Sequence, residues 1–228
     1  AELSIVFDAG SQTTLNLAGK VGLFVKGDSS TASLLGQIVA SVGAYWFFSG
    51  DVVYANLVNF ATASVLELTD SEIISIERSA TGIGSNGVPI TACSIQYGKI
   101  ETVQNENDLA GSVSVERKSE LSKEYRNAFV FDSAVMVRHR LAESLKIDSV
   151  LINESDANAV AVRLLNLFKH RVDVVSITAV VAEVPNLTLG VGIRVFSNRL
   201  GYEQGKLLTL TGFEIDAKRK RITLECIG

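Results

Sequence analysis

The 228-residue sequence is poor in the residues from which disulfide scaffolds and metal sites are built. It contains two cysteines and two histidines, along with a single tryptophan, a single methionine and two prolines. Two cysteines are too few for a disulfide framework, and they do not combine with the histidines in any zinc-binding spacing. No apolar stretch reaches the roughly 18 residues that a membrane helix needs, so we expect no membrane span.

The charge balance argues against a general nucleic-acid-binding protein. The formal net charge is −4, whereas a general nucleic-acid binder depends on a strong basic excess. The hydrophobic fraction of 47% is normal for a globular protein and excludes a disordered chain. The chain also begins with Ala1, and its one methionine is Met136. These two positions predict a processed protein or a portion of a longer one.

What is present is mostly strand-forming sequence. Val, Ile and Thr are frequent, and β-branched side chains fit a pleated, half-buried surface. Two segments instead carry apolar residues at helical spacing, which predicts main helices at about 30–42 and 155–171. A shorter helical turn is expected near 119–125. The expected strands are 3–7, 21–26, 73–80, 89–99, 128–137, 172–184, 190–197, 206–214 and 219–227.

Two hairpins and a division into modules can be read from the same pattern. The aromatic run from Trp46 turns at Gly50-Asp51, and the last two strands turn through Ala217-Lys218. No linker rich in Pro or Ser divides the chain. We therefore expect modules that are interleaved or tightly joined, one covering 1–100 and the other covering 101–228.

The segment Gly82–Gly87 matches the dinucleotide fingerprint G-x-G-x-x-G in form. That fingerprint must open a helix, because the helix N-terminus holds the pyrophosphate. Here Val88-Pro89 and an alternating strand pattern follow instead. The segment therefore predicts a glycine-rich turn, with no phosphate site.

The remaining candidates for chemistry also favour structural roles. Neither His139 nor His170 is near an acid that would orient it, although a triad can assemble in space. Acidic pairs are scattered, and Asp70 and Asp156 are typical of turns and helix caps. A glycosidase needs two carboxylates in a sugar cleft, usually with aromatic platforms, which are scarce here. We therefore assign no catalytic, cofactor-binding or metal-binding residue.

One basic run, one aromatic run and the two cysteines remain to be interpreted. The basic run Lys218–Arg221 is expected to be a solvated hairpin turn. The aromatic run Tyr45–Phe48 is expected to pack mostly in a core, with an interface as the alternative. Cys93 and Cys226 lie in alternating strand patterns and are expected to be buried thiols.

The order of pieces in the C-terminal third is distinctive. A helix at 155–171 and a long strand precede Leu187–Gly192. The run Arg199–Lys206 follows, and Leu208–Asp216 and a strand ending at Gly228 close the chain. This order resembles the closing module of tail-tip or baseplate hub proteins of tailed bacteriophages. Upstream, Gly43–Trp46, Thr69–Ile74 and Ile95–Lys99 resemble the same pattern, which departs at Gly192, where the family usually carries an aspartate.

The resemblance implies a mainly β fold with α+β inserts, built of β-barrel or tube-like hub modules, and a C-terminal portion of a larger tail protein. It implies a structural, non-enzymatic virion component that is assembled in the bacterial host cytoplasm and uses no cofactor. Its expected partners are tail tube, distal tail, and fibre or spike proteins, with transient contact to passing DNA or tape-measure protein. It also implies a homotrimer around the tail axis, which would cover the many edge strands.

The sequence leaves two alternative hypotheses for the function open, a binding module and an enzyme. A stand-alone carbohydrate- or receptor-binding module would be monomeric and would present an exposed aromatic patch. A hydrolase would show perturbed carboxylates or a histidine–nucleophile pair in a pocket.

Overall fold

The computed structural model describes residues 6–25, 27–105, 109–110, 112–181 and 187–228. The chain forms two compact units, and each of them is assembled from three segments. The first unit comprises 1–57, 92–131 and 144–165, and the second comprises 58–91, 132–143 and 166–228. The division into modules at residue 100 stays a prediction, because grouping by proximity does not test which segments fold independently.

The first unit begins with a small sheet and two capped helices. The sheet has the order β1-β3-β2, with β1 (Val6–Phe7), β2 (Ala44–Ser49) and β3 (Val52–Leu57). The Gly50-Asp51 turn joins β2 to β3 as predicted, and Gly50 has the positive φ of 60° that suits glycine. Asp8 caps α1 (Ala9–Asn16) and Ser30 caps α2 (Thr31–Ser41), each by accepting a backbone hydrogen bond.

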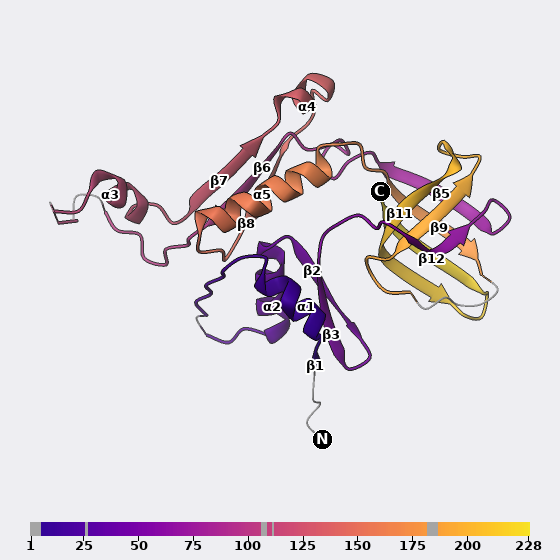
Figure 1. Cartoon of the computed structure of the whole chain (residues 1–228), viewed down its shortest axis with the longest axis horizontal. Helices are drawn as coiled ribbons and strands as arrows, with labels where there is room; N and C mark the ends of the chain where they lie inside the picture. Colours follow the sequence, from indigo (N-terminus) through magenta and orange to yellow (C-terminus); the bar gives the residue numbers. More distant parts are fainter. Residues whose placement is uncertain (1–5, 26, 106–108, 111, 182–186) are drawn as a thin grey trace. The chain divides into compact units, whose positions relative to one another are not determined.

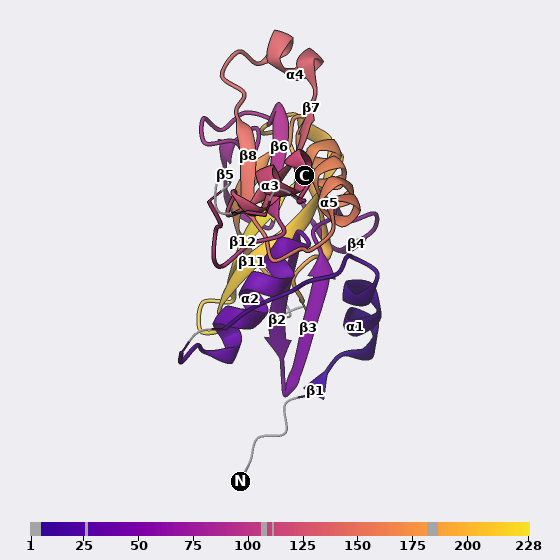
Figure 2. The ribbon, with the colours of Figure 1, turned by 90° about the vertical axis from the view of Figure 1, so that its left-hand side faces the viewer.

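A second sheet of this unit has the order β7-β6-β8. Strand β6 (Ala92–Tyr97) lies in the centre, antiparallel to β7 (Arg126–Phe131) and parallel to β8 (Ser144–Asp148). Helix α5 (Glu154–Phe168) lies against one side of this sheet (Figures 1 and 2). Its apolar stripe is buried as the sequence spacing predicts: Ala157, Val160, Ala161, Leu164, Leu165 and Phe168.

The second unit is built on one six-stranded sheet of order β4-β10-β11-β12-β9-β5. All neighbours are antiparallel except β4 and β10. The strands are β4 (Ser64–Leu68), β5 (Ile73–Ala80), β9 (Val174–Val180), β10 (Gly192–Ser197), β11 (Tyr202–Asp216) and β12 (Arg221–Ile227). Their inward side chains form one core, which includes Ile177, Leu208 and Leu224.

The mainly β class with α+β inserts and the two main helices is confirmed. The expected β-barrel is not closed: within the described residues, β4 and β5 remain the two edges of the six-stranded sheet. No described helix is long and apolar enough to cross a membrane.

Some boundaries were predicted wrongly, for local reasons. The segment expected as a strand at 21–26 makes one isolated bridge, Val21 to Leu151, in its described part. The strand expected at 128–137 ends at Phe131, because Asp132 accepts a hydrogen bond from Ala134 N and caps α4 (Ser133–Arg138). The helical turn expected near 119–125 lies earlier, as α3 (Val115–Leu121). Residues 3–5, 26 and 182–184 of the expected strands lie outside the described part of the chain.

Candidate interaction surface

The β7-β6-β8 sheet has one covered face and one face that is open along its edge strands β7 and β8, which we call the open face. Cys93, Ile95 and Tyr97 of β6 are buried on the covered face, where Tyr97 meets Glu154 of α5. Because side chains alternate along a strand, Phe129 and Phe131 of β7 point to the opposite face. Their exposed fractions are 56% and 49%, so this face offers aromatic surface to solvent.

The two phenylalanines form an ordered aromatic pair. Their rings are stacked, with centroids 6.5 Å apart and planes inclined by 11°. Ser94 of β6 lies opposite Phe129 and donates its hydroxyl hydrogen to Oδ1 of Asn127 over 2.7 Å. Lys146 of β8 completes the row that runs through Phe129 and Ser94. The open face is thus apolar at β7 and charged at β8.

Strand β7 is also an edge of its sheet. The amide of Asp132 donates to Thr91 O over 2.9 Å, at the β6 side of the ladder. Because antiparallel hydrogen bonding alternates, Asn127, Phe129 and Phe131 direct their backbone N–H and C=O groups away from β6. Such a row is a template for pairing, and charged residues usually guard it. Here none of the three residues is charged.

A groove of about 800 Å³ opens at one end of this sheet, and its cations Lys99 and Arg126 each lie beside a carboxylate. Lys99 lies 3.2 Å from Glu101 Oε1 and above the ring of Tyr125. Arg126 Nη2 lies 3.2 Å from Glu120 Oε2, while its buried Nε has no hydrogen-bond partner within the described part of the chain. Because each cation already has a carboxylate partner, and Asp148 of the lining adds a negative charge, the groove gathers no unpaired positive charge for an anion.

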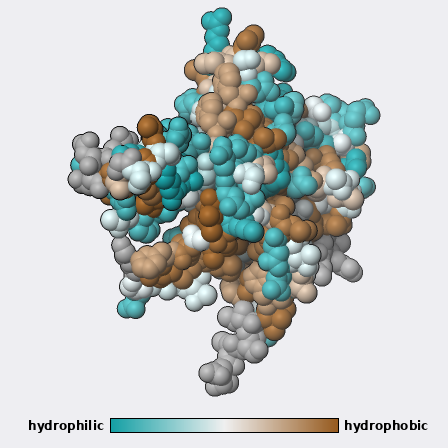
Figure 3. Space-filling model, turned by 60° about the vertical axis from the view of Figure 1, so that its left-hand side comes forward, coloured by the Kyte–Doolittle hydropathy of each residue, from teal (hydrophilic) through white to brown (hydrophobic). Residues whose placement is uncertain are grey.

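Apolar side chains reach the surface elsewhere in the first unit as well. Leu17 and Phe24 are exposed, and a second, more apolar groove of about 620 Å³ is lined in part by Phe7, Leu15 and Ile38. The space-filling view shows apolar patches among polar ones (Figure 3). The β7 surface combines exposed aromatic rings with open backbone groups, as does the edge strand β2 with Phe48, but on β7 two stacked phenylalanines are exposed on one face.

The residues considered for chemistry occupy structural positions. His139 ends α4, where its amide donates to Val135 O, and His170 follows α5. Neither histidine pairs with a carboxylate within the described residues, and no three metal-ligating side chains cluster there. These placements give no support to a triad or a zinc site.

The glycine-rich segment is a closed turn. The amide of Gly84 donates to Val88 O, and that of Gly87 donates to Gly84 O. A Cβ at Gly82 would overlap the backbone of Val88 and Pro89, so the chain must pass itself closely there. No helix follows before β6. The structure therefore agrees with a turn and provides no helix N-terminus for a phosphate.

Asp70 and Asp156 hold backbone segments together. Asp70 accepts hydrogen bonds from the hydroxyl of Ser197 and the amide of Asn198, which lower its pKa. Asp156, in the first turn of α5, accepts from the amide of Lys20, which lowers the pKa of that carboxyl. Asp70 lies in a turn, as predicted, whereas the prediction of a helix cap at Asp156 was wrong, because its carboxylate binds the amide of Lys20 from another segment.

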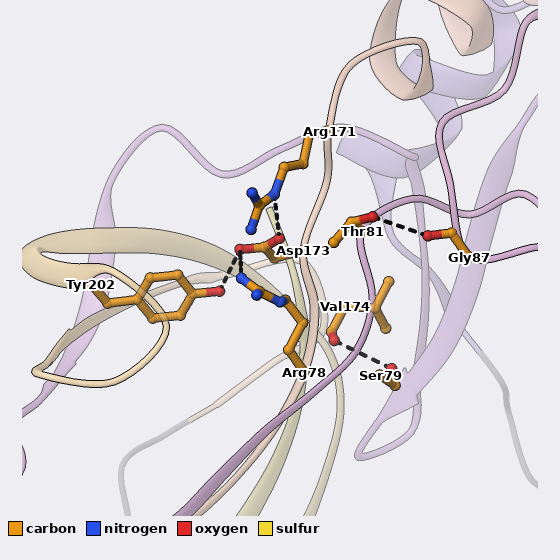
Figure 4. A network of polar contacts seen from close by, with 8 residues as sticks. All are labelled: Arg78, Ser79, Thr81, Gly87, Arg171, Asp173, Val174 and Tyr202. Atoms are coloured by element: carbon orange, nitrogen blue, oxygen red, sulfur yellow. Dashed lines mark hydrogen bonds and ion pairs between the residues drawn. The ribbon is translucent and has the colours of Figure 1, made fainter. Parts of the chain in front are cut away.

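The most buried carboxylate lies in the second unit and is fully engaged (Figure 4). Asp173 is 4% exposed and accepts from Tyr202 Oη over 2.7 Å, while Arg171 Nε lies 3.0 Å from Oδ1. Arg78 Nη1 lies 3.4 Å from Oδ2. Burial alone would raise the pKa of Asp173, but these three groups outweigh it and lower the pKa. A carboxylate held in this way joins strands and has no free oxygen to offer as a base.

The predictions for the cysteines and the basic run are confirmed, whereas the prediction for the aromatic run needs correction. Both cysteines are buried, and burial raises the pKa of Cys93 to about 11 and that of Cys226 to about 12. Lys218–Arg221 is an exposed hairpin turn, as expected. The prediction of a mostly buried aromatic run was wrong: Trp46 and its neighbours are half-buried and Phe48 is exposed, because β2 is the edge strand of its sheet.

With this geometry described, the chain can be compared with known proteins. No protein-family model matches it, and no curated protein matches it in sequence. A tail protein from Neisseria meningitidis has a similar structure, with a TM-score of 0.55 and 13% identity, over 91% of this chain and 58% of that one. The chain has the fold of this tail protein. Because the match covers 58% of the Neisseria protein, this chain spans less than two thirds of the length of the protein that it resembles.

Two prophage tail proteins give weaker similarity. The 43 kDa tail protein of prophage MuSo2 from Shewanella oneidensis has a TM-score of 0.48 and 13% identity, over 90% of this chain and 56% of that one. Prophage tail protein gp18 from Listeria monocytogenes has a TM-score of 0.44 and 10% identity, over 87% and 53%. The expected likeness to phage tail proteins is thus confirmed for the fold by the Neisseria protein.

The sequence reasoning missed the aromatic pair on β7. Phe129 and Phe131 alternate with Ala128 and Val130 within the predicted strand 128–137, so the sequence already placed the two rings on one face. Extending that strand to residue 137 hid the signal, because the phenylalanines then formed part of a longer apolar run.

Proposed function

We propose that the chain is a structural component of a bacteriophage tail, in the tail tip or baseplate hub of the virion, and that it is not an enzyme. The observation that carries this proposal is the fold shared with a tail protein over 91% of the chain. The edge strand β7 supports it, because its outward residues Asn127, Phe129 and Phe131 are exposed and uncharged, and a protein whose role is assembly needs surfaces that other subunits can cover.

In this role the chain contacts other tail proteins, and copies surround the tail axis as a homotrimer. Cyclic symmetry lets each copy cover an edge of the next without leaving a terminal subunit. The proposed neighbours are tail tube, distal tail, and fibre or spike proteins, with DNA and tape-measure protein passing along the axis.

Electron microscopy of particles that carry a peptide tag at Gly228 tests the proposal. Tag-directed gold label should appear at the axis of the tail tip. Label away from the axis, or its absence from purified particles, would contradict a hub role. In addition, native mass spectrometry of the tail-tip assembly should give three copies, and any other number would contradict the trimer.

A further inference from the structure

Strand β8 forms the other edge of the sheet that contains β7. Its residues Ser144, Lys146 and Asp148 are exposed on the open face, whereas Leu145 and Ile147 turn toward the covered face. The amide of Ser149 donates to Gln96 O over 3.0 Å, on the β6 side. By alternation, Ser144, Lys146 and Asp148 direct their backbone groups away from β6.

The two edges of the sheet therefore match each other. On each edge, the three residues with outward backbone groups also carry their side chains on the open face. Strand β7 is antiparallel and β8 is parallel to β6, so they would run antiparallel to each other if one sheet continued into the next. We propose that β7 of one copy pairs with β8 of a second copy, with Phe129 opposite Lys146. This inference rests on the proposed function, because it names the partner in the assembly around the tail axis.

One register pairs all three residues of each edge. With Phe129 opposite Lys146, Asn127 lies opposite Asp148 and Phe131 lies opposite Ser144. Directly opposite side chains in an antiparallel pair have Cβ atoms about 5 Å apart, so the ammonium of Lys146 reaches the face of Phe129. The amide of Asn127 can donate to the Asp148 carboxylate, and the small Ser144 leaves room beside the second ring.

Charge favours the pairing of β7 with β8 over the pairing of two β8 strands with each other. An antiparallel pair of two β8 strands centred on Lys146 would place two ammonium groups opposite each other, which is unfavourable. Two β7 strands could pair about a two-fold axis, since no charge opposes them, but that contact is closed after two copies. A ring around an axis needs a head-to-tail contact between two different surfaces, and β7 with β8 provides one.

Disulfide trapping tests the register directly. Chains that carry Asn127→Cys are mixed with chains that carry Asp148→Cys under mild oxidation. The native cysteines do not interfere, because both are buried. Hydrogen-bonded partners have Cα atoms about 5.5 Å apart, within the range that a disulfide spans. We expect at least ten-fold more cross-linked dimer from the mixture than from either variant alone. The matched mixture of Asn127→Cys with Phe131→Cys reports the two-fold β7 pair. Cross-linking in that mixture instead, or in neither mixture, would overturn the proposal.

A charge exchange provides an independent measurement. Phe129→Lys places two ammonium groups opposite each other and should weaken association at least ten-fold in sedimentation equilibrium. Adding Lys146→Glu in the same chain should restore it. The control is Phe48→Lys on β2, a phenylalanine of similar exposure (54%), which should associate as the parent does. If Phe129→Lys associates normally, or if the second change does not rescue it, the edge pairing is wrong.

The two proposals can fail separately. A chain that lies on the tail axis but gives no Asn127–Asp148 cross-link retains its proposed function and excludes this interface. A chain absent from tail particles removes the proposed function, whatever the cross-linking shows.

Discussion

Tyr202 donates its hydroxyl hydrogen to Oδ2 of Asp173 over 2.7 Å, and both side chains are buried in the second unit. Tyr202 is the first residue of β11, while Asp173 precedes β9 and exchanges backbone hydrogen bonds with Gly228. Arg78 of β5 reaches the same carboxylate. The carboxylate of Asp173 thus ties the start of β11 to the edge strand β5 (Figure 4), while its backbone binds Gly228.

Removing the tyrosine hydroxyl should destabilise the second unit. In Tyr202→Phe the ring stays in place, but the buried carboxylate loses a hydrogen bond of the charged kind, which costs about 1–3 kcal/mol. Urea denaturation followed by circular dichroism would measure the change. The matched control is Tyr54→Phe on β3, because the Tyr54 hydroxyl makes no hydrogen bond to a described residue. Its effect should stay within about 0.5 kcal/mol, and an equal loss in both variants would contradict the role assigned to Tyr202.

The same carboxylate should make stability depend on acid. The pKa of Asp173 is lowered in the folded chain, so its contribution is fully present above the unfolded value of about 3.9 and is lost as the pH falls through the lower folded value. Asp173→Asn should therefore be less stable than the parent at pH 7, and the difference should shrink below about pH 4. Urea denaturation at pH 7, 5 and 3 would measure it. A difference that grows toward acid would show that the pKa is raised instead.

Much of the fold was predictable because its signals are local. Strand β5 has the bounds 73–80 that alternation predicted, and α2 and α5 follow their apolar stripes. Helix α1 was missed because Ala9–Asn16 has no such stripe, and only the capping carboxylate of Asp8 marks its start. Residues 21–25 have strand-like composition, but a strand needs a neighbour with a free edge, and composition does not supply one.

The candidate surface was less predictable than the fold. That Phe129 is exposed follows from which face α5 covers, and that β7 is an edge follows from the order β7-β6-β8. Neither property belongs to a single segment, so alternation within one strand does not reveal it.

Gly192 should be intolerant of any side chain. It begins β10 and pairs with Ser64 of β4, and an added Cβ would overlap the carbonyl oxygen of Ala63. This close approach leaves no room for a side chain at this position. Gly192→Ala should cost about 1–3 kcal/mol by forcing the strands apart, which a lowered thermal unfolding midpoint would show.

Gly36→Ala provides the matched control for that substitution. Gly36 lies within α2, and the nearest atom to an added Cβ is Trp46 Nε1 at 3.8 Å, an ordinary contact. Alanine favours a helix interior by about 0.5–1 kcal/mol over glycine, so this variant should melt at the same temperature or higher. If both alanine variants lower the midpoint equally, the clash at Ala63 is not the cause.

The two thiols should be silent in the folded protein and reactive once it unfolds. Burial raises the pKa of Cys93 to about 11 and that of Cys226 to about 12, so almost no thiolate forms at pH 8, and access is blocked as well. Ellman's reagent at pH 8 should therefore label neither cysteine in buffer and both in 6 M guanidinium. The cysteines lie in different units, Cys93 on β6 and Cys226 on β12. Intermediate urea concentrations, with mass spectrometry of each labelled peptide, should consequently report which unit opens first. Rapid labelling of Cys93 without denaturant would show that α5 does not cover its face of the sheet.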